Sequence, residues 1–146
     1  MSKYQNILVA VELKDKEDQI IINKAQELAK FYGSTLSIVH VIEHFSSFAT
    51  ATAGMAIVEL EESISMEHKT KLEKLAKSQN ISDNNVFLCA GSISSGIHDI
   101  AKKTNAGLII TGNHSRHGLA LLFGSTVDSI LHHSDADVLA VYLPKQ

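Results

Sequence analysis

A glycine-rich segment in the last third of the chain carries the residue types best suited to hold an anion. Residues 112–118 read Gly-Asn-His-Ser-Arg-His-Gly, and Gly124-Ser125-Thr126 follows a short apolar stretch. Glycine lets the backbone turn tightly and approach a ligand, and the free amides at a helix start favour a negative charge such as a phosphate. The same residues also suit an ordinary helix start with Gly124 or Ser125 as its N-cap, so the pattern alone leaves both interpretations open.

Histidines near the same segment raise two further chemistries, a metal site and a hydrolase. His114 and His117 have no cysteine near them in the sequence that could complete a metal site. The adjacent His132 and His133 would point about 100 degrees apart on a helix. A hydrolase built on Ser125 would need a Gly-x-Ser-x-Gly elbow after a strand, and the sequence has none. We therefore expect neither a metal site nor a catalytic residue here.

The segments that must position this loop are short apolar strands alternating with amphipathic helices. The predicted strands cover residues 7–11, 35–41, 86–90, 108–111 and 137–143. Apolar residues at helical spacing predict helices over residues 16–32 and 55–77, around Ile97 to Ala101, and after Gly124 with Val127, Ile130 and Leu131 on one face. Gly33 is the predicted C-terminal cap of the first helix, and residues 42–54 are predicted to form a surface loop.

This alternation predicts an α/β fold with a doubly wound parallel sheet of five strands, in the order 3-2-1-4-5, between two layers of helices. The length of 146 residues and the lack of any linker-like stretch indicate one domain. In such sheets ligands bind outside the carboxyl ends of the strands, where the strand order reverses. The ends of the first, second and fourth predicted strands therefore form the candidate site.

Composition excludes several classes of function. A net charge of -3 with both signs interspersed gives no basic face for nucleic acid or a membrane surface. No apolar stretch approaches the roughly 20 residues that span a bilayer, so we expect a cytoplasmic protein. Cys89 is the only cysteine, which agrees with a reducing compartment, and its apolar neighbours predict a buried structural thiol.

Four stretches together resemble the universal stress protein family over nearly the whole chain: TGNHSRHGLALLFGST, YQNILVAVEL, LSIVHVIE and DVLAVYLP. The resemblance implies a single domain over residues 1–146 with the fold of the adenine-nucleotide alpha hydrolases. Nucleotide-binding members hold the phosphates of ATP on a glycine motif. Gly112 and Gly124-Ser125 match that motif, but Ser115 replaces its second glycine, and the spacer that follows has eight residues, one fewer than the family pattern.

The resemblance also assigns roles to residues at the strand ends. It places Ala10, Val11 and Val41 at the adenine and Glu12, where the family usually has Asp, at the ribose. The hydroxyls of Ser125 and Thr126 would meet the phosphates. The alternatives are a core residue for Val41 and a solvated carboxylate for Glu12. The side chain at Ser115 takes up room that a triphosphate needs, so a monophosphate suits the loop better.

The resulting hypothesis is a small stress-response module that binds an adenine nucleotide, AMP or ATP, with Mg²⁺ only if a triphosphate is bound. The alternatives are a protein-interaction module that binds no nucleotide and a slow ATPase, for which the sequence offers no arginine finger or catalytic base. The protein partner is not named by the sequence.

The last predicted strand lies at an edge of the sheet, and an open apolar edge invites pairing. We therefore expect a homodimer joined through this strand, with Val141 and Leu143 buried about a two-fold axis. Family members similar to this chain dimerise in that way. The alternative is a monomer in which Pro144 and the polar tail shield the edge.

Overall fold

The computed structural model describes residues 3–43, 55–113, 129–132 and 134–144, with the side chains of residues 55–60 left aside. Its strands are β1 (Asn6–Ala10), β2 (Thr35–Ile42), β3 (Val86–Ala90), β4 (Leu108–Asn113) and β5 (Asp137–Tyr142). Its helices are α1 (Asp15–Tyr32), α3 (Met55–Ser78) and α4 (Ile93–Lys103). A short 3-10 helix over Asp83–Asn85, which the sequence pattern did not predict, leads into β3.

The sheet has the predicted order, β3-β2-β1-β4-β5, and every neighbouring pair is parallel. β1 lies at the centre, with Val9 opposite Ile38 of β2 on one side and Ile110 of β4 on the other. The chain moves from β1 to β2 in one direction and returns to β4 on the opposite side. The strand order therefore reverses between β1 and β4, which is where the fold favours a ligand.

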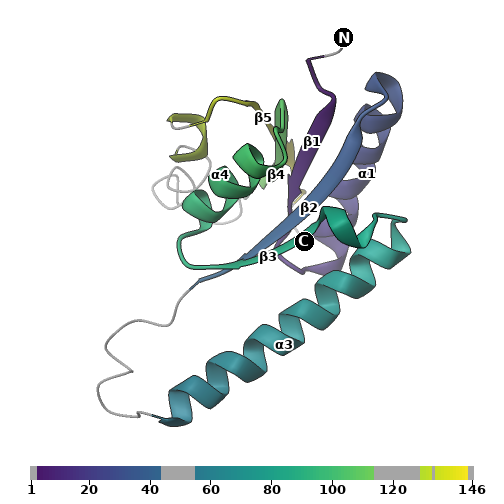
Figure 1. Ribbon diagram of the computed structural model, residues 1–146. Helices are drawn as coiled ribbons and strands as arrows, with labels where there is room; N and C mark the ends of the chain where they lie inside the picture. The colour runs from purple at the N-terminus through teal and green to yellow at the C-terminus, as the bar shows by residue number, and fades with distance from the viewer. Residues whose placement is uncertain (1–2, 44–54, 114–128, 133, 145–146) are drawn as a thin grey trace.

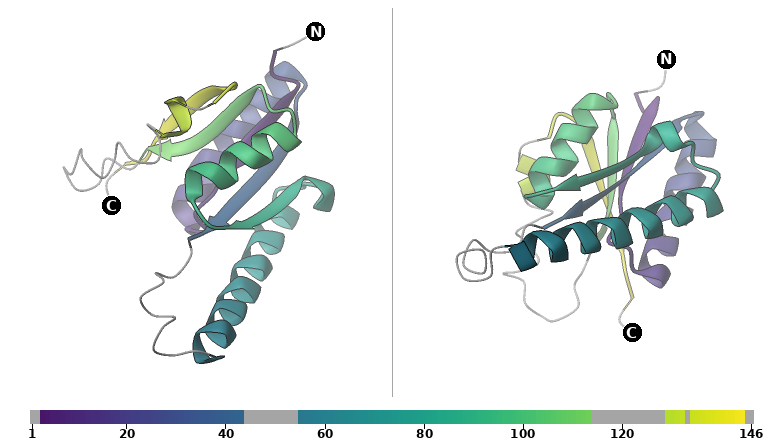
Figure 2. Two further views of the ribbon diagram at one scale, coloured as in Figure 1. Left: turned by 60° about the vertical axis from the view of Figure 1, so that its left-hand side comes forward. Right: turned by 60° about the horizontal axis from the view of Figure 1, so that its bottom comes forward.

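Helices cover both faces of the sheet and bury a core on each (Figures 1 and 2). On one face, residues of α1 and α3 such as Ile22 and Leu72 pack against Ile7 and Val9. On the other, Ile97 and Ala101 of α4 pack with Leu8 and Ile109. Adjacent strand residues thus face opposite layers, which is why the strands read as continuous apolar runs. The predicted three-layer α/β fold is confirmed.

Two predicted local features can be checked in the described residues. Gly33 caps α1 with φ of 67° in the left-handed region, as predicted. In the last helix, of which residues 129–132 are described, Ile130 is fully buried but Leu131 is 54% exposed. The prediction that Leu131 shares the buried face was wrong, because successive residues on a helix point about 100 degrees apart.

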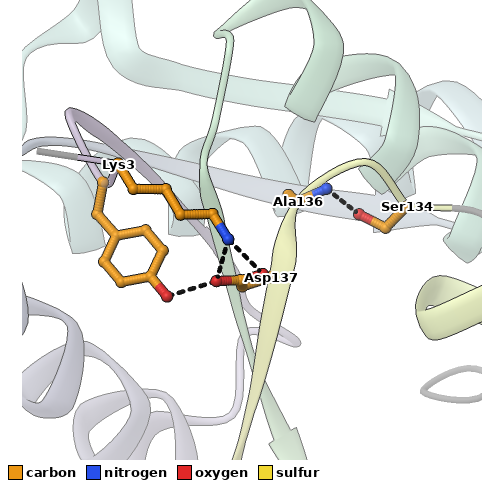
Figure 3. A network of polar contacts seen from close by, with 5 residues as sticks. Lys3, Ser134, Ala136 and Asp137 are labelled. Carbon is orange, nitrogen blue, oxygen red and sulfur yellow. Dashed lines mark hydrogen bonds and ion pairs between the residues drawn. The ribbon is translucent and has the colours of Figure 1, made fainter.

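A polar network ties the start of the chain to the last strand at the amino end of the sheet (Figure 3). The Lys3 ammonium lies 2.8 Å from Oδ2 of Asp137, and the Tyr4 hydroxyl donates to the same oxygen at 2.5 Å. The side chains of Lys3 and Asp137 are 67% and 44% exposed, so water competes for both charges. Lys3 and Tyr4 together lower the pKa of the Asp137 carboxyl.

Within the described residues, no helix is both long enough and apolar enough to span a membrane.

Candidate functional site

The carboxyl ends of β1, β2 and β4 bring together five of the residues that the sequence placed at a site. Ala10 and Gly112 belong to the adjacent strands β1 and β4, and Val41 belongs to β2 on the other side of β1. Val11 directly follows β1, and its N–H donates to the Val39 carbonyl at 2.9 Å. Glu12 comes next and is exposed. The confirmed strand order thus places these five residues at one end of the sheet.

Val41 has a packing role that favours the core interpretation of its side chain. It is 8% exposed and belongs to the core beneath α4. A Cβ added at Gly96 of α4 would lie 2.8 Å from Cγ2 of Val41, which is closer than side chains tolerate. Gly96 thus allows α4 to approach β2 closely.

Gly112 also has a packing role that is independent of any ligand. A Cβ at this position would lie 2.7 Å from Cδ1 of Leu143 and 2.9 Å from Cδ1 of Ile21. The glycine leaves room for these two apolar side chains under the α1 layer. Leu143 is 2% exposed and lies within the core of a single chain. The expectation that Leu143 is buried in a dimer seam was therefore wrong, because its own chain already buries it.

Glu12 belongs to the tight loop between β1 and α1. Its carboxylate forms an ion pair with the Lys14 ammonium at 3.2 Å, and both side chains are about half exposed. Its backbone N–H donates to Oδ1 of Asp18 at 3.1 Å. Leu13, the next residue, has a φ of 62°, a left-handed conformation that costs a non-glycine residue about 1–2 kcal/mol.

Asp18 was missed by the sequence analysis although it is 2% exposed. Burial raises the pKa of its carboxyl, while hydrogen bonds from the backbone of Glu12, Lys14 and Leu13 work in the opposite direction. An acidic residue in the first turn of a helix is ordinary in sequence, where it complements the helix dipole. The sequence therefore gave no signal that this carboxylate turns inward to the loop.

His40 lies beside the same loop, on the face of the sheet covered by α1 and α3. Its Nδ1 is 2.8 Å from the Val11 carbonyl oxygen, and its Nε2 is 2.9 Å from Nδ1 of His68 on α3. Because a carbonyl only accepts, Nδ1 of His40 donates, and Nε2 then accepts from His68. Burial lowers the pKa of His40. His40 thus joins β2 to α3 through His68, 28 residues away, a contact that the sequence pattern did not predict.

Cys89 of β3 packs against the core beneath α4, but it is half-buried and not fully buried as predicted. Burial, with the charge of Asp99, raises the pKa of this thiol. A higher thiol pKa lowers the thiolate fraction and with it the reactivity of the side chain.

The phosphate part of the predicted site lies outside the described residues. This applies to Ser115, Gly124, Ser125 and Thr126, and also to His114, His117 and His133. Among the residues that are described, no three histidine, cysteine or acidic side chains gather as a metal site would require.

Comparison with known proteins agrees with this fold. A model of the universal stress protein family matches residues 3–142. The chain is 37% identical over 141 residues to universal stress protein A homolog 2 of Coxiella burnetii, covering 97% of each protein. It is 33% identical over 141 residues to universal stress protein A homolog 1 of the same organism.

Solved structures of the same family share the fold. Universal stress protein UspA from Lactobacillus plantarum superposes with a TM-score of 0.74 at 23% identity, over 97% of this chain and 99% of that one. A universal stress protein solved in complex with cAMP has a TM-score of 0.60 at 22% identity, over 96% and 98%. At these identities the structures support the fold alone. With the family match over almost the full length, the chain belongs to the universal stress protein family.

Proposed function

We propose that this protein is a cytoplasmic stress-response module that binds an adenine nucleotide at the carboxyl ends of β1, β2 and β4. The observation that carries the proposal is the grouping of Ala10, Glu12 and Gly112 where the strand order reverses. Gly112 is also the first residue of the glycine motif that continues along the sequence to Gly124. A related structure holds cAMP, an adenine nucleotide, which supports this ligand class.

The described residues suit the base and sugar of such a ligand. The side chains of Val11 and Val41 are buried in the cores on opposite faces of the sheet, so an adenine at this end would meet the backbone of both residues. Glu12 is exposed and offers carboxylate oxygens to ribose hydroxyls. The phosphates would meet Ser115, Gly124, Ser125 and Thr126, and Mg²⁺ would take part only with a triphosphate.

The test is calorimetry with ATP, ADP and AMP on protein stripped of ligand, together with Gly124→Asp. The carboxylate of this variant would stand where the phosphates bind, so we expect binding to be lost while the fold persists. Thr126→Ser is the matched control, because it keeps the hydroxyl donor, and it should bind like the unmodified protein. Retained affinity in Gly124→Asp would rule out this phosphate site. Multiple-turnover release of phosphate from ATP would indicate the slow ATPase instead.

Among the described residues no strand pairs with the outer side of β5, which favours a second function, a homodimeric interaction module. β5 is the last strand of the sheet, and its apolar residues Val138, Leu139 and Val141 stay half-exposed. Pairing of two β5 strands would satisfy their free backbone groups and cover Val141. Sedimentation at micromolar concentration should give a dimer, and Val141→Lys should shift it to monomer, whereas Val141→Ile should not. A single species of about 16 kDa for the unmodified protein would contradict the dimer.

A further inference from the structure

A buried carboxylate lies directly beneath the loop that carries Glu12. Asp18, in the first turn of α1, accepts the Glu12 N–H on Oδ1 at 3.1 Å and is almost completely shielded from water. The Asp18 N–H in turn donates to the Lys14 carbonyl at 2.9 Å. Asp18 thus forms hydrogen bonds with the loop through both its side chain and its backbone.

The loop needs such support because its own conformation is unfavourable. Leu13 has a φ of 62°, in the region that residues other than glycine rarely adopt. The ion pair between Glu12 and Lys14 is too exposed to hold the backbone, since water and salt screen it. The buried hydrogen bond from the Glu12 N–H to the charged Asp18 carboxylate is stronger than this exposed ion pair.

We propose that Asp18 is a positioning residue, whose buried carboxylate fixes the backbone of residues 12–14 and so sets where the Glu12 side chain meets the sugar of the nucleotide. This inference rests on the proposed function for its ligand but not for the state of the loop. Asp18 itself does not touch the ligand and acts only through Glu12.

The competing explanation is that Asp18 merely stabilises the start of α1, as acidic residues do near a helix N-terminus. Asp15 provides the matched control, because it lies in the same first turn and is exposed. Asp15→Ala removes the same charge from the same helix end and leaves the contact to Glu12 in place. A helix-dipole role would make the two variants behave alike.

The first readout needs no ligand: amide hydrogen exchange at Glu12 and Leu13, followed by NMR. Loss of a hydrogen bond to a charged acceptor should speed exchange roughly tenfold in Asp18→Ala and leave it unchanged in Asp15→Ala. If Asp18→Ala fails to fold, Asp18→Asn keeps an acceptor oxygen and should give a smaller increase. Unchanged exchange at Glu12 in a folded Asp18 variant would overturn the proposal.

The second readout is a double-mutant cycle on AMP affinity. We expect Asp18→Ala to weaken binding about tenfold in the unmodified chain and to add little in a Glu12→Ala background, because both changes remove one interaction. Equal effects in both backgrounds would show that Asp18 does not act through Glu12. If the unmodified protein binds no AMP, ADP or ATP, the proposed function fails, and the exchange experiment still decides whether Asp18 holds the loop.

Discussion

The two ends of the sheet hold their polar groups in opposite ways. At the amino end, Lys3 and Tyr4 meet Asp137 in contact with solvent. At the carboxyl end, Asp18 and His40 make their hydrogen bonds inside the protein, to a backbone amide and a backbone carbonyl. Exposed ion pairs add little to stability, whereas buried polar groups cost free energy if their partners are removed. The comparison teaches that buried polar groups hold the backbone at the candidate site, even though the Glu12–Lys14 ion pair there is exposed.

The strongest way to break this comparison is to remove His40. His40→Ala deletes both of its hydrogen bonds and leaves a cavity between β2 and α3, so we expect a loss of about 2–4 kcal/mol in the free energy of unfolding. Urea titration measures it. His68→Ala is the control, because it removes only one of the two bonds from a half-buried side chain. A loss no larger than that of His68→Ala would contradict the role of burial.

The stability of the unmodified protein should also depend on pH through His40, and His40→Ala tests this. Burial lowers the pKa of His40 below its ordinary value of 6.5, so the unfolded chain binds more protons than the folded one in the window between these two pKa values. The stability of the unmodified protein should therefore fall as the pH drops from 6.5 toward the folded pKa. This part of the pH dependence should be absent in His40→Ala. The stability difference between the two proteins should narrow with acid. A constant difference between pH 7.5 and 5.5 would contradict the lowered pKa.

Substitution of one glycine at each end of the sheet tests the same comparison, with a smaller expected effect on stability. Gly112→Ala should cost about 1–3 kcal/mol, because its Cβ would overlap Leu143 and Ile21. At the amino end, Gly33→Ala has no atom within 4 Å of the added Cβ and should cost only about 1 kcal/mol for its left-handed φ. Urea titration of both variants tests the order. A larger loss in Gly33→Ala would show that conformation outweighs packing.

The smallest effect is expected from Asp137→Asn at the amino end. Lys3 lowers the pKa of Asp137, so the stability that the carboxylate adds is present above its ordinary pKa of 3.8 and is lost as the pH falls through the folded value. Since the groups are exposed, the melting temperature at pH 7 should fall less than in Gly33→Ala, and 1 M salt should remove most of the difference. Asp135→Asn, at an exposed neighbouring position, is the control. An effect that persists in salt would contradict this assignment.

The order of strands and helices could be predicted from the sequence because each element carries a local pattern. The apolar run at Val86–Ala90 has the same bounds in the structure as in the prediction, and α1 differs by one residue at its start. The cap at Gly33 was also readable, since a glycine after a helical repeat has a specific conformational reason. The grouping of Ala10, Glu12 and Gly112 followed from the parallel sheet, in which the carboxyl ends of all strands lie at the same end of the sheet.

The support of the candidate site was decided only by the tertiary structure. Nothing local distinguishes the buried Asp18 from the exposed Asp15 in the same helical turn, because burial depends on how the helix packs. The contact of His40 with His68 joins two elements that are not paired by any pattern. Gly112 was predicted for ligand approach, yet its absent side chain makes room for Leu143. Local periodicity thus determined the elements and their order, whereas packing across the layers decided which polar groups are buried and what they hold.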